Sequence, residues 1–142
     1  MEDEFLEVAK QAALKAGKVI MSYYGKDHEL MIKTDNSDFA TQADLAAEKV
    51  IVEILTKHFP SHNIISEEKV RINNKSNYTW AIDPVDGTVS FASRMPFFAV
   101  SIGLLKNQQP IVGMIYHVEP GDLYWAEKGK GAYLNGKKIS VS

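Results

Sequence analysis

The spacing of hydrophobic and polar positions changes near the middle of the chain. Over Glu2 to about Tyr24, apolar side chains recur at three- and four-residue steps, which predicts an amphipathic helix with Gly25 as its C-cap. After a polar loop, a second helix is predicted from near Thr41 to about His58, and Phe59-Pro60 ends it. The apolar face of the first helix comprises Phe5, Ala9, Ala12, Ala16, Val19 and Tyr23.

Beyond residue 60, short β-prone runs replace the helical spacing. Asn135-Gly136 is the strongest hairpin signal among them, because both residue types tolerate a positive φ. Turn-like separators between the runs predict antiparallel neighbours. The predicted strands are Asn63–Ser66, Tyr78–Ile82, Phe97–Leu105, Ile111–Val118, Leu123–Glu127 and Ala132–Val141. We therefore expect an α+β fold in one domain, with helices over 1–60 packed on a mostly antiparallel β-sheet over 61–142.

Composition excludes several classes of protein. The chain has 142 residues, 45% hydrophobic and 24% charged, which suits one soluble globular domain. A net charge of −2 without a basic block argues against nucleic acid or an anionic membrane as the main partner. The absence of cysteine excludes disulfides, thiolate chemistry and zinc–sulfur sites. The N-terminus opens acidic where a signal peptide would open basic, so we expect a cytoplasmic protein.

The stretch "WAIDPVDGTVSF" places two carboxylates at the end of an apolar run. Asp83, Pro84 and the following glycine suit a type I turn, so a purely structural turn is one interpretation. The other is a metal loop, because a carboxylate at the end of a buried strand needs a partner and Asp86 can reach the same point. Gly87 and Thr88 would then offer backbone amides and a hydroxyl to a phosphate.

The spacing of these acids separates metal-binding classes. An EF-hand calcium loop needs acids at alternate positions, which Asp83 and Asp86 break. Nucleophilic-aspartate phosphatases use Asp-x-Asp, which is also absent here. The spacing fits a hard cation with oxygen ligands, most often Mg²⁺ clamping a phosphate.

Other acids have ordinary interpretations when taken alone. Glu67 and Glu68 follow a short apolar strand and suit a solvated acidic turn. Asp44 falls in the first turn of the predicted second helix, where it would complement the helix dipole. His58 and His62 are separated by a proline, so a shared helical face is not expected.

Taken together, "DFATQAD", "SEE", "DPVDGTVSF", "PFFAVSIGLL" and "GKGAYLNGKKISVS" resemble the inositol monophosphatase family. This family belongs to the Mg²⁺-dependent, lithium-sensitive phosphatase superfamily that includes fructose-1,6-bisphosphatases. The resemblance runs in order along essentially the whole chain. It implies the first half of the layered sugar-phosphatase fold.

The resemblance also implies a metal-ligand set. Glu67 would be a metal ligand, and Glu68 would lie behind it. Asp83 would bridge two Mg²⁺ ions. The backbone carbonyl of Val85 would complete the first site and Asp86 would ligate the second ion, in an intact enzyme that uses two or three.

Catalytic and substrate-binding roles follow from the same resemblance. Asp44 and Thr88 would orient and deprotonate the attacking water, while Gly87 and Thr88 amides, beside Asp86, would hold the phosphate. Lys33 matches a lysine in the family's mobile loop, and an ordinary exposed lysine is an equal alternative. The chain departs from the family at Ser90, where asparagine is usual.

Length is the larger departure, because family members are nearly twice as long. The chain is expected to be the N-terminal half, without a further metal-binding aspartate and most sugar contacts. Glu119, Asp122 and Glu127 match no ligand position. The fragment is therefore expected to be weak or inactive, with an association-prone sheet face.

The resemblance implies Mg²⁺-dependent hydrolysis of a small phosphorylated sugar or inositol, with neither nucleic acid nor membrane as partner. A phosphatase acting on 3′-phosphoadenosine 5′-phosphate is an alternative within the superfamily. A non-catalytic interaction or regulatory module, binding a partner or itself through the sheet, is the alternative of another class. Oligomeric state stays open, although such enzymes are often dimers.

Overall fold

The computed structural model describes residues 2–24, 36–86 and 98–140, and it contains two long helices. Helix α1 spans Glu2–Tyr24, as the periodicity predicts. Helix α3 spans Asn36–His58 and so begins earlier than the predicted start near Thr41. Asn and Ser at such a start, with Asp in the first turn, favour a helix N-terminus, so the polar composition that suggested a loop is compatible with a helix. Neither described helix has the length and apolarity needed to cross a membrane.

All strands of the described chain form one eight-stranded sheet in the order β2-β1-β3-β4-β5-β6-β7-β8. The strands are β1 (Asn63–Ser66), β2 (Arg71–Ile72), β3 (Tyr78–Asp86), β4 (Ala99–Lys106), β5 (Gln109–His117), β6 (Asp122–Glu127), β7 (Gly131–Leu134) and β8 (Lys137–Ile139). Every neighbouring pair is antiparallel except β1 and β3, which run parallel. The predicted α+β class and mostly antiparallel sheet are confirmed. The two-residue strand β2 is too short for its sequence to have signalled it.

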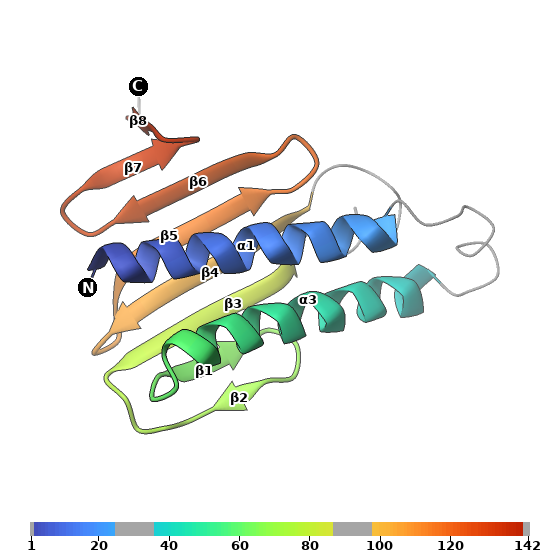
Figure 1. Cartoon of the computed structure of the whole chain (residues 1–142), viewed down its shortest axis with the longest axis horizontal. Coiled ribbons are helices and arrows are strands. Elements are labelled where there is room, and N and C mark those ends of the chain that lie inside the picture. Colours follow the sequence, from blue (N-terminus) through green and yellow to red (C-terminus); the bar gives the residue numbers. More distant parts are fainter. Residues whose placement is uncertain (1, 25–35, 87–97, 141–142) are drawn as a thin grey trace.

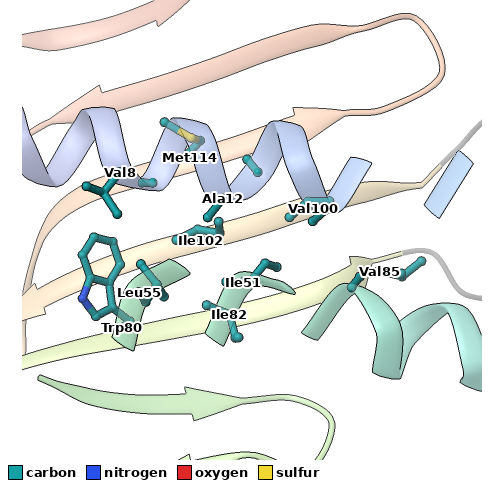
Figure 2. Packing of buried hydrophobic residues seen from close by; sticks show 14 of the residues in the cluster. Val8, Ala12, Ile51, Leu55, Trp80, Ile82, Val85, Val100, Ile102 and Met114 are labelled. Atoms are coloured by element: carbon teal, nitrogen blue, oxygen red, sulfur yellow. The ribbon is translucent and has the colours of Figure 1, made fainter. Parts of the chain in front are cut away.

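The helices lie side by side across one face of the sheet, as Figure 1 shows. Small residues on α1, among them Ala9, Ala12 and Ala16, are fully buried and bring this helix close to its neighbours. Figure 2 shows Trp80, Ile82 and Ile102 of the central strands pointing into the space beneath α1 and α3. The core is therefore a single layer between the two helices and one face of the sheet.

The opposite face of the sheet, which we call the outer face, is not covered by any described element. Ile65 and Ile115 remain 48% and 50% exposed there, and Tyr124 remains 37% exposed. In the cross-strand register, Ile115 pairs with Tyr124, so these two form one apolar surface. Exposed apolar residues that adjoin one another in this way are typical of a contact surface.

The chain from Asp83 to Asp86 lies within β3 and contains a β-bulge, so the predicted type I turn is wrong. Asp83 pairs with Ser101 and Asp86 with Ala99, and one extra residue therefore sits on β3. Proline cannot donate a ladder hydrogen bond, and Pro84 is fully buried at this irregular point. The extra residue interrupts the regular alternation of β3 between Asp83 and Asp86.

The predicted last strand is divided in two by the predicted Asn-Gly turn. Asn135 and Gly136 have φ of 50° and 89°, and they join β7 to β8. Asn135 also reaches sideways to β6, where its Oδ1 accepts a hydrogen bond from the Leu123 amide at 2.8 Å and its Nδ2 donates to Asp122 at 2.9 Å. The hairpin is thus fixed both by backbone conformation and by a side-chain bridge.

Candidate functional site

The structure places Glu67 and Asp83 next to each other at one end of the sheet. Ser66 at the end of β1 pairs with Ile82 of the parallel strand β3, and the Glu67 amide donates to the Ile82 carbonyl at 3.0 Å. The residues that follow this pair are Glu67 and Asp83, and both line a hollow of about 360 Å³. Two acids that are 16 positions apart in sequence therefore share one local environment.

The hollow exists because three aligned positions carry almost no side chain. Ala81, Gly103 and Gly113 are successive partners across β3, β4 and β5. A Cβ added at Gly113 would meet nothing within 4 Å, so the outer face is open there. Arg71 also lines the hollow and brings a positive group to the side occupied by the two acids.

The β-bulge determines how the two aspartates of "DPVD" are related. In a regular strand, residues three apart lie on opposite faces. Here Asp83 pairs with Ser101 and Asp86 pairs with Ala99, and these two partners are two residues apart on β4. Because residues two apart lie on the same face of a strand, positions 83 and 86 belong to the same face of the sheet. Ile82 and Val85, each one residue earlier, both lie in the core and show the same shift.

Asp44 lies on the helical side of the same end of the sheet. In Figure 2, Ile51 of α3 lies beside Ile82 of β3, and Figure 1 shows α3 and β3 running in opposite directions. Asp44 is seven residues before Ile51, about two helical turns or ~10 Å along the axis. Val85 is three residues after Ile82, but the β-bulge takes up one of them, so the strand advances by about two residues, or ~7 Å. Asp44 thus comes close to the end of β3 that contains Val85.

The structure does not support the helix-dipole explanation that the sequence offered for Asp44. Because α3 begins at Asn36, Asp44 lies more than two turns inside the helix, where the dipole effect has faded. Its side chain is only 4% exposed. A buried carboxylate in a helix interior is costly unless it has partners, so the helix dipole alone does not account for Asp44.

A second buried carboxylate, Glu48, was missed by the sequence reasoning. It is 4% exposed, one turn after Asp44, and accepts hydrogen bonds from the amides of Lys69 and Val70. Burial raises the pKa of Glu48, but hydrogen bonds from the Ser66 hydroxyl and from those amides outweigh it and hold the pKa below its usual value. The available signal was an acid four residues after Asp44, within the apolar spacing of the helix.

The donor set brought together by the fold suits a hard cation. Carboxylate oxygens of Glu67 and Asp83 are the ligand type that Mg²⁺ prefers. The structure describes residues 2–24, 36–86 and 98–140, but not the side chain of Asp86. Among the side chains that it describes, no three acidic or histidine groups are close enough together to hold a metal ion. Two carboxylates beside the hollow are therefore the part of the predicted ligand set that the structure assembles.

Three predicted site residues lie outside the described residues: Lys33, Gly87 and Thr88. Ser90, the departure from the family pattern, lies outside them as well. The Val85 side chain is buried in the core, which leaves only its backbone carbonyl for the predicted metal role. Asp122 bonds to Asn135 in the last hairpin, and Glu127 lies 3.8 Å from the Lys130 ammonium.

Comparison with known proteins gives a consistent result along the chain. The model of the inositol monophosphatase family matches residues 1–142. The fructose-1,6-bisphosphatase/inositol-1-monophosphatase of Aquifex aeolicus is 43% identical over 139 residues, which is 97% of this chain and 53% of that protein. Human inositol monophosphatase 1 is 39% identical over 143 residues, covering 98% of this chain and 52% of the human protein.

A solved structure agrees with these sequence matches. The inositol monophosphatase from Anabaena (Nostoc) superposes with a TM-score of 0.85 at 41% identity, covering 99% of this chain and 50% of that one. The chain thus spans about half the length of the relatives that it matches. With the family model matched over residues 1–142, the chain belongs to the inositol monophosphatase family.

Proposed function

We propose that this chain forms the metal-binding half of a Mg²⁺-dependent phosphomonoester hydrolase. The observation that carries the proposal is the adjacency of Glu67, directly after β1, and Asp83 of the parallel strand β3, beside one hollow. A family that is generally metal-dependent gives this pair of acids a chemical purpose. An acidic surface turn, the ordinary alternative for Glu67, gives no reason for a second acid to lie alongside it.

In this proposal the acids divide into metal ligands and water-activating groups. Glu67, Asp83, the Val85 carbonyl and Asp86 would hold the metal. Asp44, with the Thr88 hydroxyl, orients the attacking water and takes its proton. The amides of Gly87 and Thr88 bind the phosphate oxygens.

Phosphoryl transfer requires mainly positioning and neutralisation of charge. Bound Mg²⁺ would lower the pKa of a coordinated water and offset negative charge on the phosphate. The protein would contribute by holding its acids at fixed separations. The β-bulge at Pro84 supports this, because it puts positions 83 and 86 on the same face of the sheet.

The substrate class is a small phosphorylated sugar or inositol. Relatives named as inositol monophosphatases and as a fructose-1,6-bisphosphatase/inositol-1-monophosphatase support this class. A nucleotide-type substrate such as 3′-phosphoadenosine 5′-phosphate is the alternative in the same class of reaction. One matched structure, at 28% identity, is a SaIMPase-II described as 2′AMP-bound, and another is described as inositol-monophosphate-bound.

The 142 residues alone are expected to be weak or inactive. We would measure phosphate release by the malachite-green assay from inositol monophosphate, fructose-1,6-bisphosphate and 3′-phosphoadenosine 5′-phosphate. Each substrate is tested with and without Mg²⁺, using this chain and a chain extended to the length of its relatives. Robust Mg²⁺-dependent turnover by the short chain would contradict the inactivity, and an extended chain without Mg²⁺-dependent turnover would contradict the proposed function.

A non-catalytic interaction module is the second candidate, favoured by the exposed apolar residues of the outer face. Calorimetric Mg²⁺ titration of the wild type and of Asp83→Asn separates the two. The hydrolase proposal expects binding that the substitution weakens, because one ligand oxygen loses its charge. Identical titrations would favour the interaction module.

A further inference from the structure

The loop between β1 and β2 is tied to α3 by the buried carboxylate of Glu48. Its Oε2 atom accepts hydrogen bonds from the Lys69 amide at 2.8 Å and from the Val70 amide at 3.1 Å. In Figure 1 this loop lies beside the middle turns of α3. Two amides directed at one ionised oxygen form a strong and geometrically restrictive contact.

The same loop is also fixed at its other end, at Ser66. This residue is fully buried, and its hydroxyl donates to Glu48 while accepting from the Glu68 amide at 3.2 Å. The Ser66 carbonyl accepts a hydrogen bond from the Arg71 guanidinium, and the Ser66 amide donates to the Val70 carbonyl at 2.9 Å.

Glu67 lies inside this constrained loop, and its own side chain is exposed. Residues on both sides of it are bonded to Glu48, while its amide is bonded to β3. The loop therefore has little freedom to carry the Glu67 carboxylate away from Asp83, although two neighbouring carboxylates repel each other. The bonds from this loop to Glu48 therefore help to keep the two carboxylates adjacent despite this repulsion.

We propose that Glu48 is a positioning residue for the metal site. It holds the loop of residues 66–70 so that the Glu67 carboxylate stays beside Asp83, without contacting the metal itself. The inference rests on the proposed function, since it assigns Glu48 a purpose in metal binding. Residues that orient metal ligands in this way typically change metal affinity by about 10–100-fold when replaced.

The test compares Glu48→Ala and Glu48→Gln with Glu53→Ala, which removes an exposed carboxylate from the same helix. Mg²⁺ affinity is measured by calorimetry on the 142-residue chain, with circular dichroism as the check on folding. Glu48→Ala should weaken the affinity by about 10-fold or more. Glu48→Gln should restore part of it because its amide oxygen still accepts hydrogen bonds, and Glu53→Ala should bind as the wild type does. A folded Glu48→Ala chain with wild-type affinity would overturn the inference.

Hydrogen exchange in the wild type provides a second measurement if Glu48→Ala fails to fold. Coupling between two sites is reciprocal, so Mg²⁺ must slow exchange of the Lys69 and Val70 amides if their bonds to Glu48 favour metal binding. Unchanged exchange of these two amides at saturating Mg²⁺ would refute the inference. Asp83→Asn distinguishes failure of the proposed function from failure of this inference alone. If Asp83→Asn binds Mg²⁺ as the wild type does, both the proposed function and the inference fail. If Asp83→Asn weakens binding and Glu48→Ala does not, only the inference fails.

Discussion

The indole Nε1 of Trp80 donates a hydrogen bond of 3.0 Å to Nδ1 of His62. The imidazole also stacks between two rings, with centroids 4.8 Å from Phe59 and 4.8 Å from Tyr78. Phe5 of α1 packs against the same cluster. His62 must be unprotonated at Nδ1 to accept this hydrogen bond, so the packing of α1 on β3 depends on its neutral form.

Stability should therefore fall as the pH falls through the ordinary titration range of histidine. Burial lowers the pKa of His62 in the folded protein, so the unfolded chain binds the proton more tightly. The resulting stability is present above the unfolded pKa of about 6.5 and is lost below it. The Lys106 ammonium lies 5.7 Å from the centroid of the Tyr78 ring, and its positive charge would further disfavour an imidazolium at His62. Urea unfolding midpoints at pH 8, 7, 6 and 5.5 measure the effect.

The control for this prediction compares replacement of His62 with replacement of His58. His62→Gln should lower stability at pH 8 and flatten its dependence between pH 8 and 5.5. His58→Gln, at an exposed position, should retain the wild-type slope. An equal slope in wild type and His62→Gln would show that another group is responsible.

Gly17 gives the Tyr116 ring room beneath α1. A Cβ at position 17 would lie 2.4 Å from Cε2 of Tyr116, closer than two carbons can approach. We expect Gly17→Ala to lower the free energy of unfolding by about 1–3 kcal/mol through overpacking. In a Tyr116→Leu background the same change should raise it by up to about 1 kcal/mol, the helix preference of alanine over glycine. Equal effects in both backgrounds, measured by urea unfolding, would contradict the contact.

Asn135 links the last hairpin to β6 through both side-chain atoms. Asn135→Ala removes these bonds and places alanine at a φ of 50°. We expect a loss of about 1–3 kcal/mol from the two hydrogen bonds and the strained conformation. Asn135→Gly restores the conformational freedom alone, so its unfolding free energy should fall between those of alanine and wild type. A glycine variant no more stable than the alanine variant would assign the whole effect to the side chain.

The sequence was most informative where periodicity and turn chemistry act locally. The bounds of α1 and β1 match their predictions, and Asn135-Gly136 forms the expected hairpin. The start of α3 was misplaced because Asn, Ser and Asp favour both loops and the first turn of a helix. Local composition does not separate these two states.

The candidate site shows a different limit. The acids of "DPVDGT" were identified, but a turn and a β-bulge have similar local residue preferences, and only pairing with β4 distinguishes them. The contact of Glu48 with Lys69 and Val70 spans more than 20 residues and leaves no local pattern. The parallel pairing of β1 with β3, which brings Glu67 beside Asp83, was likewise not indicated by the short separators.

The outer face of the sheet is the last feature that leads to a prediction. Ile115 lies in the middle of β5, 50% exposed, next to Tyr124 on one side and Ser101 on the other. The 142-residue chain is expected to associate through this face, because burying a side chain of this size contributes about 1.5–3 kcal/mol. Ile115→Lys should reduce concentration-dependent association in sedimentation velocity, since a buried lysine would have to be desolvated.

The matched control is Leu14→Lys, which replaces an apolar side chain that is 37% exposed on α1, in the helical layer. Both lysine variants should change the unfolding free energy by about 0.5 kcal/mol or less, as exposed substitutions usually do. Only Ile115→Lys should shift the sedimentation profile and lower binding of a hydrophobic dye. If Leu14→Lys lowers association as much as Ile115→Lys, the contact surface is not the outer face. In a chain extended to the length of its relatives, we expect the added residues to cover the outer face, so Ile115→Lys should instead lower the free energy of unfolding.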